Sequence, residues 1–235
     1  MRILITGSNR GLGFEFMQQY LELKNQVIGT CRNPEKAVKL QDLKLQYPDN
    51  LIIVQLDVTD KNSIQRAHKE ITKNFESIDL LINNAGIISG DGENQFPLGE
   101  IHTEDILQIL NTNSVAPLLI SEQFLDLLEK GTNPKIVNVS SGMGSIGQKS
   151  STSHYSYCMS KAALNMASKM LSIELKSRRI AVWPIHPGWN RTDMGGANAT
   201  LDPRESVASM IRVIADKTVL DSGKFLNWDG TESLW

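Results

Sequence analysis

Short apolar runs alternate along the chain with longer segments in which apolar and polar positions are mixed. The runs are rich in Ile, Val and Leu and alternate little, which is typical of parallel strands buried on both faces. We expect seven strands, at Arg2–Thr6, Gln26–Thr30, Leu51–Gln55, Leu80–Asn83, Lys135–Val139, Ile180–Ile185 and Lys224–Leu226. The longer segments predict helices over 11–24, 34–47, 60–75, 103–129, 155–178 and 203–216.

This repeated strand–helix alternation predicts an α/β fold. We expect a Rossmann-type, doubly wound parallel sheet of seven strands in the order 3-2-1-4-5-6-7, with helices on both faces. The length of 235 residues, 40% of them hydrophobic, fits one domain over 1–235. The irregular stretches 84–102 and 187–202 each follow a predicted strand, so we expect both on the ligand-binding edge of the sheet.

Charge and composition argue against nucleic-acid and membrane partners and indicate the cellular compartment. With 24 basic and 26 acidic residues the formal net charge is −2, and no basic stripe is present to neutralise nucleic-acid phosphates. No apolar stretch reaches membrane-spanning length, and the N-terminus has no signal-peptide pattern. The two cysteines, Cys31 and Cys158, form no disulfide framework, so we expect a cytoplasmic protein. We assign no metal ligands.

A glycine-rich turn follows the first predicted strand. Its small residues would let the backbone approach a pyrophosphate, and the following helix would offer free N–H groups. The spacing is G-x-x-x-G-x-G rather than G-x-G-x-x-G, and a plain tight turn is the alternative. The cofactor contacts that we expect from this turn are Gly7, Asn9, Arg10, Gly11, Leu12 and Gly13.

The end of the second strand indicates which dinucleotide is bound. An acidic residue there would accept hydrogen bonds from the ribose of NAD, but the chain has Arg32, which suits the 2′-phosphate of NADP. Arg10 would be a second cation, although both arginines are alternatively solvated surface charges. Asp57, after the third strand, is expected at the adenine or, alternatively, as a helix cap, and we include the neighbouring Val58 among the cofactor contacts. We therefore expect NADP in preference to NAD.

Tyr157 and Lys161 lie one helical turn apart and on one face of their predicted helix. The reference pKa of tyrosine is near 10, and a neighbouring ammonium is expected to lower it. In a carbonyl reduction, Tyr157 would protonate the developing alkoxide, and Lys161 would stabilise the phenolate and bind the nicotinamide ribose. Because Y-x-x-x-K is common by chance, an ordinary helix remains the alternative for this motif alone.

Two further positions are candidates for the same site. Ser140 and Ser141 end the fifth strand, and we expect the Ser141 hydroxyl to orient the substrate carbonyl, although both serines alternatively just end the strand. Pro117 follows Asn113 by four residues and has no N–H, so the Asn113 carbonyl loses its helical donor. That carbonyl could hold a water that relays protons from Lys161, or the helix is simply kinked at the surface.

Together these motifs resemble the short-chain dehydrogenase/reductase family, and within it the sniffer- and C-factor-like carbonyl reductases. The resemblance rests on Thr6–Gly13, Asp57, Asn83–Gly86, Asn113, Ser141, Tyr157, Lys161, Pro187-Gly188 and Thr192. It implies catalysis by Ser141, Tyr157 and Lys161 assisted by Asn113. It also implies cofactor contacts from Asn84, Ala85, Gly86, Tyr157, Lys161, Pro187, Gly188 and Thr192.

The chain departs from the common family pattern at two points. Ser141 precedes Tyr157 by 16 residues, more than is usual in the family, and the sniffer-like group shares this extension. Asn190 replaces a small apolar residue in the loop after Pro187. This substitution affects the expected shape of the loop rather than the Thr192 contact.

The expected substrate is a small hydrophobic aldehyde, ketone or quinone, because the candidate pocket residues are mainly apolar or aromatic. These residues are Phe96, Met143, His154, Tyr155, Trp189 and Met194. The leading interpretation is an NADPH-dependent carbonyl reductase. The alternatives are a dinucleotide-binding cell-signalling protein with secondary catalysis, and an NAD-dependent alcohol dehydrogenase.

The resemblance also implies a homodimer or homotetramer built on the helices 103–129 and 155–178. The apolar positions of these helices would equally serve a monomer's core. They are Leu118, Leu119, Ile120, Leu164, Met166, Met170 and Leu171.

Overall fold

The computed structural model describes residues 1–88, 98–152 and 154–235 and contains the expected seven-stranded sheet. The strand order is β3-β2-β1-β4-β5-β6-β7, and every neighbouring pair is parallel, which confirms the predicted doubly wound topology. The strands are β1 Arg2–Ile5, β2 Gln26–Cys31, β3 Leu51–Gln55, β4 Leu80–Asn83, β5 Lys135–Val139, β6 Ala181–His186 and β7 Leu226–Asn227.

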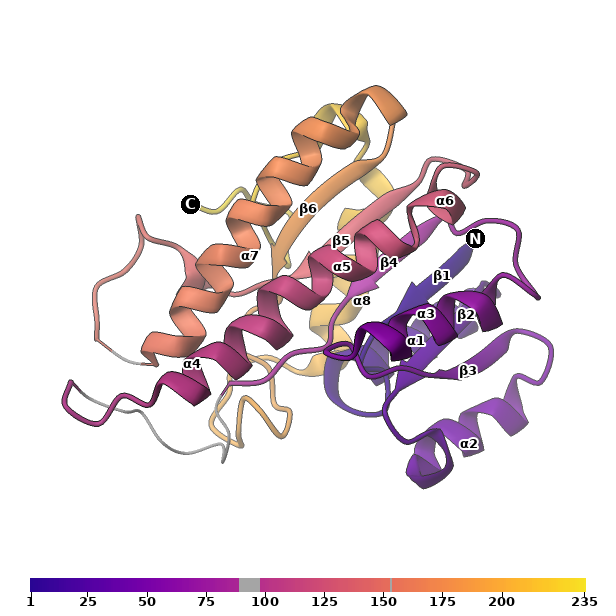
Figure 1. Ribbon diagram of the computed structural model, residues 1–235, viewed down its shortest axis with the longest axis horizontal. Helices are drawn as coiled ribbons and strands as arrows, with labels where there is room; N and C mark the ends of the chain where they lie inside the picture. Colours follow the sequence, from indigo (N-terminus) through magenta and orange to yellow (C-terminus); the bar gives the residue numbers. More distant parts are fainter. Residues whose placement is uncertain (89–97, 153) are drawn as a thin grey trace.

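Helices connect the strands and cover both faces of the sheet (Figure 1). The α-helices are α1 Gly11–Glu22, α2 Val38–Gln46, α3 Lys61–Ile71, α4 Thr103–Leu110, α5 Ala116–Gln123, α6 Leu125–Leu128, α7 Tyr155–Glu174 and α8 Pro203–Asp216. Short 3₁₀ turns lie at Pro34–Lys36, Gly142–Gly144, Leu175–Arg178 and Val219–Asp221. Within the described residues, no helix combines the length and apolar character that crossing a bilayer requires.

Two apolar clusters hold the helices to the sheet, one on each face. Side chains of α1, α2 and α8 pack on one face, with Phe16 and Met210 fully buried there. Side chains of α3, α5 and α6 pack on the other, around the buried Phe124. In Figure 1, α4, α5 and α7 lie in front of the sheet and α8 lies behind it. Because all strands are parallel, the loops that lead from the strands to the helices of both layers lie together at the carboxyl ends of the strands.

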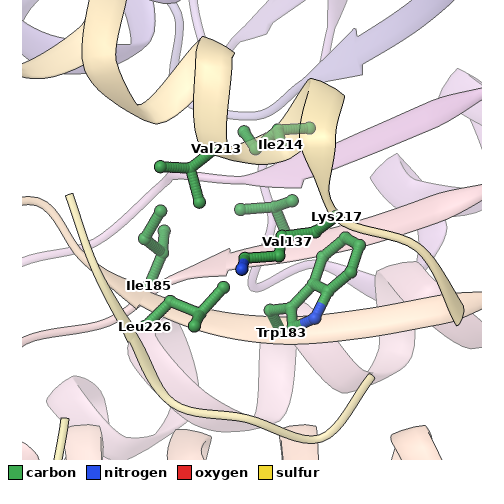
Figure 2. A pocket seen from close by; sticks show the side chains of 7 residues that line it. All are labelled: Val137, Trp183, Ile185, Val213, Ile214, Lys217 and Leu226. Atoms are coloured by element: carbon green, nitrogen blue, oxygen red, sulfur yellow. The ribbon is translucent and has the colours of Figure 1, made fainter. Parts of the chain in front are cut away.

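The contact between α8 and the sheet is tightly packed (Figure 2). Val213 and Ile214 of α8 face Val137, Ile185 and Leu226 of β5, β6 and β7. The space between them leaves no room for a small molecule, and it lies away from the sequence-predicted site. We regard it as core packing rather than as a binding site.

The edge strand β7 is covered by the chain that follows it. The Asn227 amide donates to the Thr231 carbonyl over 2.8 Å, and the Ser233 amide donates to the Phe225 carbonyl over 2.8 Å. Leu226 and Glu232 form an antiparallel bridge. The backbone groups at this side of the sheet are thus paired within the chain.

The single helix predicted over 103–129 is instead divided into α4, a π-helical turn over Asn111–Val115, α5 and α6. In the π turn, the Ala116 amide donates to the Asn111 carbonyl, five residues back. Pro117 has no amide to donate to Asn113, so the regular helical ladder is interrupted here. Pro117 predicted an interruption of the helix but not the change of helix type.

The side chain of Asn113 fixes this turn between two other segments and is fully buried. Its Oδ1 accepts from the Ile87 amide over 2.9 Å, and its Nδ2 donates to the Ile87 carbonyl over 2.8 Å. Nδ2 also donates to the Ser160 hydroxyl over 3.0 Å, and that hydroxyl donates to the Tyr157 carbonyl over 2.8 Å. Asn113 therefore joins the loop after β4 to the first turns of α7.

We predict that Asn113→Ala lowers the free energy of unfolding by about 2–4 kcal/mol, because it leaves the Ile87 amide and carbonyl without their partner. Thr112→Ala is the matched control. It removes only the bond from Thr112 to the Gln108 carbonyl and should cost at most about 1 kcal/mol. Urea unfolding of both variants measures the difference, and equal costs would contradict this role of Asn113.

Candidate active site

The glycine-rich turn approaches the loop after β4 too closely for any side chain. A Cβ at Gly7, whose φ is +65°, would lie 2.8 Å from the Ala85 Cα. A Cβ at Gly13 would lie 2.4 Å from both the Asn84 Nδ2 and the Gly7 carbonyl oxygen. Real Cβ atoms do not approach backbone so closely, so the turn requires glycine at both positions.

Two polar side chains hold this turn in place. The Thr6 hydroxyl accepts from the amides of Asn84 and Ala85, over 3.0 and 3.1 Å. The Asn84 Nδ2 donates to the carbonyls of Thr6 and Gly7, each over 3.0 Å. The side-chain amide of Asn84, a predicted cofactor contact, thus stabilises the turn through these two hydrogen bonds. Thr6 also shapes the turn. Its position directly after β1 is the feature of the sequence from which this role could have been predicted.

The start of α1 has the features of an anion site. Arg10 precedes the helix in an extended conformation, and the first turn carries no acidic side chain. The amides of the first turn have no intrahelical partners, and the helix dipole makes this end positive. Together with the glycines that keep the backbone accessible, this geometry fits the pyrophosphate of a dinucleotide.

The residues predicted to select the nucleotide lie at the ends of β2 and β3. Arg32 is exposed directly after β2. The Asp57 Oδ1 accepts from the amide and hydroxyl of Thr59, over 2.9 and 2.7 Å, and so closes the turn before α3. Asp60, not Asp57, caps α3. The Val58 side chain belongs to the apolar core, which leaves only its backbone for a ligand.

The structure brings Tyr157, Lys161 and Ser141 together beneath the loop after β5. Tyr157 is 8% exposed and Lys161 5% exposed. The Lys161 Nζ donates to the Val139 carbonyl over 2.8 Å and lies 5.6 Å from the centroid of the Tyr157 ring. The Ser141 side chain hydrogen-bonds the Tyr157 phenol. The Ser140 hydroxyl instead donates a hydrogen bond to the Asn165 Oδ1 over 2.6 Å.

Burial governs the ionisation of this group. It raises the pKa of Tyr157 to about 12, although the hydrogen bond with Ser141 partly offsets the rise. The expectation of a lowered tyrosine pKa is wrong for this structure, because burial removes the phenolate from water and is the largest cause of the shift. Burial also lowers the pKa of Lys161 to about 8. At neutral pH the phenol is therefore protonated and the amine charged.

The loop after β6 lies against the glycine-rich turn. Gly188 has a φ of +75°, and the Asn190 Nδ2 donates to the carbonyls of Pro187 and Gly188, over 2.7 and 3.2 Å. This is the role of the asparagine that replaces a small apolar residue: it stabilises the turn. A Cβ at Gly11 would lie 3.7 Å from the Thr192 methyl, so Thr192 reaches the start of α1.

The described candidate substrate residues lie in the loops after β5 and β6 and at the start of α7. Trp189 and Met194 are 53% and 46% exposed, and the Trp189 Nε1 donates to the Gly195 carbonyl over 2.8 Å. Met143, Tyr155 and His154 are partly buried, and His154 has a left-handed backbone conformation directly before α7. Phe96 lies outside the described residues.

The comparisons with known proteins agree with this geometry. The profile of the short chain dehydrogenase family matches residues 1–201. The C-signal protein of Myxococcus xanthus is 39% identical over 67% of this chain and 93% of its own. The NADPH-bound carbonyl reductase from chicken fatty liver superposes with a TM-score of 0.92 at 37% identity, covering 100% of this chain and 98% of its own.

A second solved structure, the carbonyl reductase Sniffer of Drosophila melanogaster, superposes with a TM-score of 0.93 at 33% identity and covers 100% of this chain and 99% of its own. The predicted family and its sniffer- and C-factor-like group are thereby confirmed. With the family profile matched over most of its length, this chain belongs to the short-chain dehydrogenase/reductase family and is an NAD(P)-dependent oxidoreductase.

Proposed function

We propose that this chain is an NADPH-dependent reductase that transfers hydride to a small hydrophobic aldehyde, ketone or quinone. The observation that carries the proposal is a buried phenol, protonated at neutral pH, in one cluster with a charged lysine and a serine hydroxyl. A reduction needs a proton donor that is neutral before the reaction and stabilised as an anion after it. Tyr157 and Lys161 meet both conditions.

The dinucleotide would lie across the carboxyl ends of the strands and supply the hydride when bound. The backbone of Gly7, Asn9, Gly11, Leu12 and Gly13 would hold its pyrophosphate, and Asp57 and the Val58 backbone its adenine. The loop Asn84–Gly86 and the residues Pro187, Gly188 and Thr192 would enclose the nicotinamide half. Gly86 is closely surrounded, because a Cβ there would lie 3.2 Å from the Asn113 Oδ1.

The reacting groups would divide the chemistry among themselves. The Ser141 hydroxyl would hydrogen-bond the substrate carbonyl and orient it towards Tyr157. The Tyr157 hydroxyl would then protonate the alkoxide oxygen, and Lys161 would stabilise the phenolate that remains. The Lys161 ammonium has three N–H donors. One of them donates to the Val139 carbonyl, so the others could donate to a nicotinamide ribose. The Asn113 carbonyl, which Pro117 deprives of its helical donor, would hold a water on the route to solvent.

We predict that Tyr157→Phe lowers turnover of a carbonyl panel by about 10²- to 10⁴-fold, because the proton donor is lost while the ring is kept. The panel contains aldehydes, quinones and diketones, and NADPH oxidation is followed by absorbance. Tyr20→Phe is the control, since it removes a buried phenol that has no hydrogen-bond partner within the α1 core. Unchanged turnover in Tyr157→Phe would contradict the assignment.

The pH dependence of the reduction follows from Lys161. Its lowered pKa, about 8, means that the ammonium is present at pH 7 and is lost as the pH rises through 8. We expect the reduction rate to fall above about pH 8, because the tyrosine anion then lacks its stabilising charge. Lys161→Arg keeps the charge and should move the fall to higher pH. A pH–rate profile of both proteins tests this, and coincident profiles would contradict it.

The cofactor preference rests on Arg32. The described chain offers this exposed guanidinium at the end of β2, where a ribose-binding carboxylate would favour NAD. We predict that Arg32→Asp weakens NADPH binding by about 10- to 100-fold relative to NADH, since charge-assisted hydrogen bonds to the 2′-phosphate are lost. Calorimetric titration measures both ligands, with Arg212→Asp on α8 as the charge control. An unchanged ratio would favour the NAD-dependent alcohol dehydrogenase instead.

A dinucleotide-binding signalling role is the second candidate, and the similarity to the C-signal protein favours it. It differs from the reductase in one testable way. A biological effect that persists in Tyr157→Phe would indicate signalling through binding rather than through turnover.

We further propose a homodimer or homotetramer through α5 and α7, in a reducing cytoplasm. The structure divides the apolar positions of these helices: Ile120 and Leu164 are core residues, whereas Leu118, Met166 and Met170 are exposed. The exposed residues supply an apolar surface that association would bury. Neither cysteine forms a disulfide among the described residues, as a reducing compartment would require.

A further inference from the structure

One ion pair connects the two loops that flank the dinucleotide site. Arg10 belongs to the glycine-rich turn, and Asp193 directly follows Thr192 in the loop after β6, 183 residues later. The Arg10 Nη1 donates to the Asp193 Oδ2 over 3.0 Å. Both side chains are largely exposed, at 69% and 74%. The guanidinium that the sequence analysis assigned to a phosphate is therefore already paired with a carboxylate of the same chain.

The neighbouring ion pair of this loop has a different role. Arg191 donates to the carbonyls of Ala199 and Thr200 and to the Asp202 carboxylate, all within the segment 191–202. It stabilises the loop internally. Asp193 instead reaches out of the loop to the glycine-rich turn, so its carboxylate acts on a residue of the cofactor site.

The chemistry of the pair makes it exchangeable. An exposed carboxylate that accepts one hydrogen bond holds a guanidinium weakly. A phosphate dianion carries more charge and three acceptor oxygens, and it can bind a guanidinium through two parallel bonds. A phosphate that arrives near Arg10 would displace Asp193, but it would first have to overcome the existing pair.

We infer that Asp193 is a specificity-determining residue that weakens the binding of 2′-phosphorylated dinucleotides by occupying Arg10. The inference rests on the proposed NADPH function and deepens it. In the proposed function the first-turn amides of α1 would bind the pyrophosphate, which leaves Arg10, together with Arg32, for the 2′-phosphate. Asp193 then lowers the affinity for NADPH and leaves that for NADH unchanged.

The test is calorimetric binding of four ligands to the wild type and to Asp193→Asn. NADPH and 2′,5′-ADP carry the 2′-phosphate, whereas NADH and 5′-AMP lack it. Asp193→Asn should tighten the first two by about two- to fivefold, the strength of an exposed ion pair, and leave the other two unchanged. The gain should shrink at high salt, where exposed charges are screened.

Two controls sharpen the result. Glu129→Gln breaks a comparable exposed ion pair, with Arg178, before the amino end of β5, and should change no affinity. In an Arg10→Ala background, Asp193→Asn should no longer tighten NADPH, because Asp193 acts through Arg10.

Three outcomes would overturn the inference: an unchanged NADPH affinity in Asp193→Asn, equal tightening of NADPH and NADH, or the full gain persisting without Arg10. If the wild type binds neither dinucleotide, the proposed function itself fails, and the inference fails with it. Thermal unfolding of each variant verifies that the fold is kept.

Discussion

The site depends on keeping a charged amine in a place from which water is nearly excluded. The Lys161 ammonium donates to the Val139 carbonyl at the end of β5, and this bond joins the sheet to α7 where the chemistry is expected. A buried charge is costly unless it is hydrogen-bonded. The lowered pKa of Lys161 is the measure of that cost. Around this bond, Asn113 and Ser160 fix α7, and Asn84 fixes the glycine-rich turn.

Burial thus favours the neutral form of both titrating groups and shifts their pKa values in opposite directions. It favours the neutral phenol of Tyr157 and it weakens, without abolishing, the charge on Lys161. A tyrosine that is already an anion could not give up a proton. In the proposed reduction the lysine would contribute after the transfer, by stabilising the anion, rather than before it by ionising the phenol.

Much of the fold could be predicted from the sequence, because its determinants are local. Unbroken apolar runs separated by amphipathic segments leave little choice but a parallel sheet with helices on both faces, and the strand order follows from the connections. The division of 103–129 was missed in detail, since helical periodicity continues through a π turn and only Pro117 marks it. Positions such as Leu164 and Met166 are equally apolar in sequence, and only the packing separates core from surface.

The site was predicted unevenly for a similar reason. Spacing along one helix placed Tyr157 beside Lys161, but the choice of Ser141 over Ser140 depends on which hydroxyl Asn165 of α7 engages. The direction of the tyrosine pKa depends on burial, which no motif encodes. The Arg10–Asp193 pair joins residues 183 positions apart and has no local signal at all.

The covering of β7 has a consequence for how copies of this chain can meet. Because residues 231–233 satisfy the backbone of that strand, a neighbouring molecule finds no free ladder there on which to continue the sheet. A contact of another molecule with this border would therefore rest on side chains rather than on strand pairing. Of the two edge strands of the sheet, β7 is thus protected from strand exchange, whereas β3, in the part of the chain that the structure describes, pairs with β2 alone.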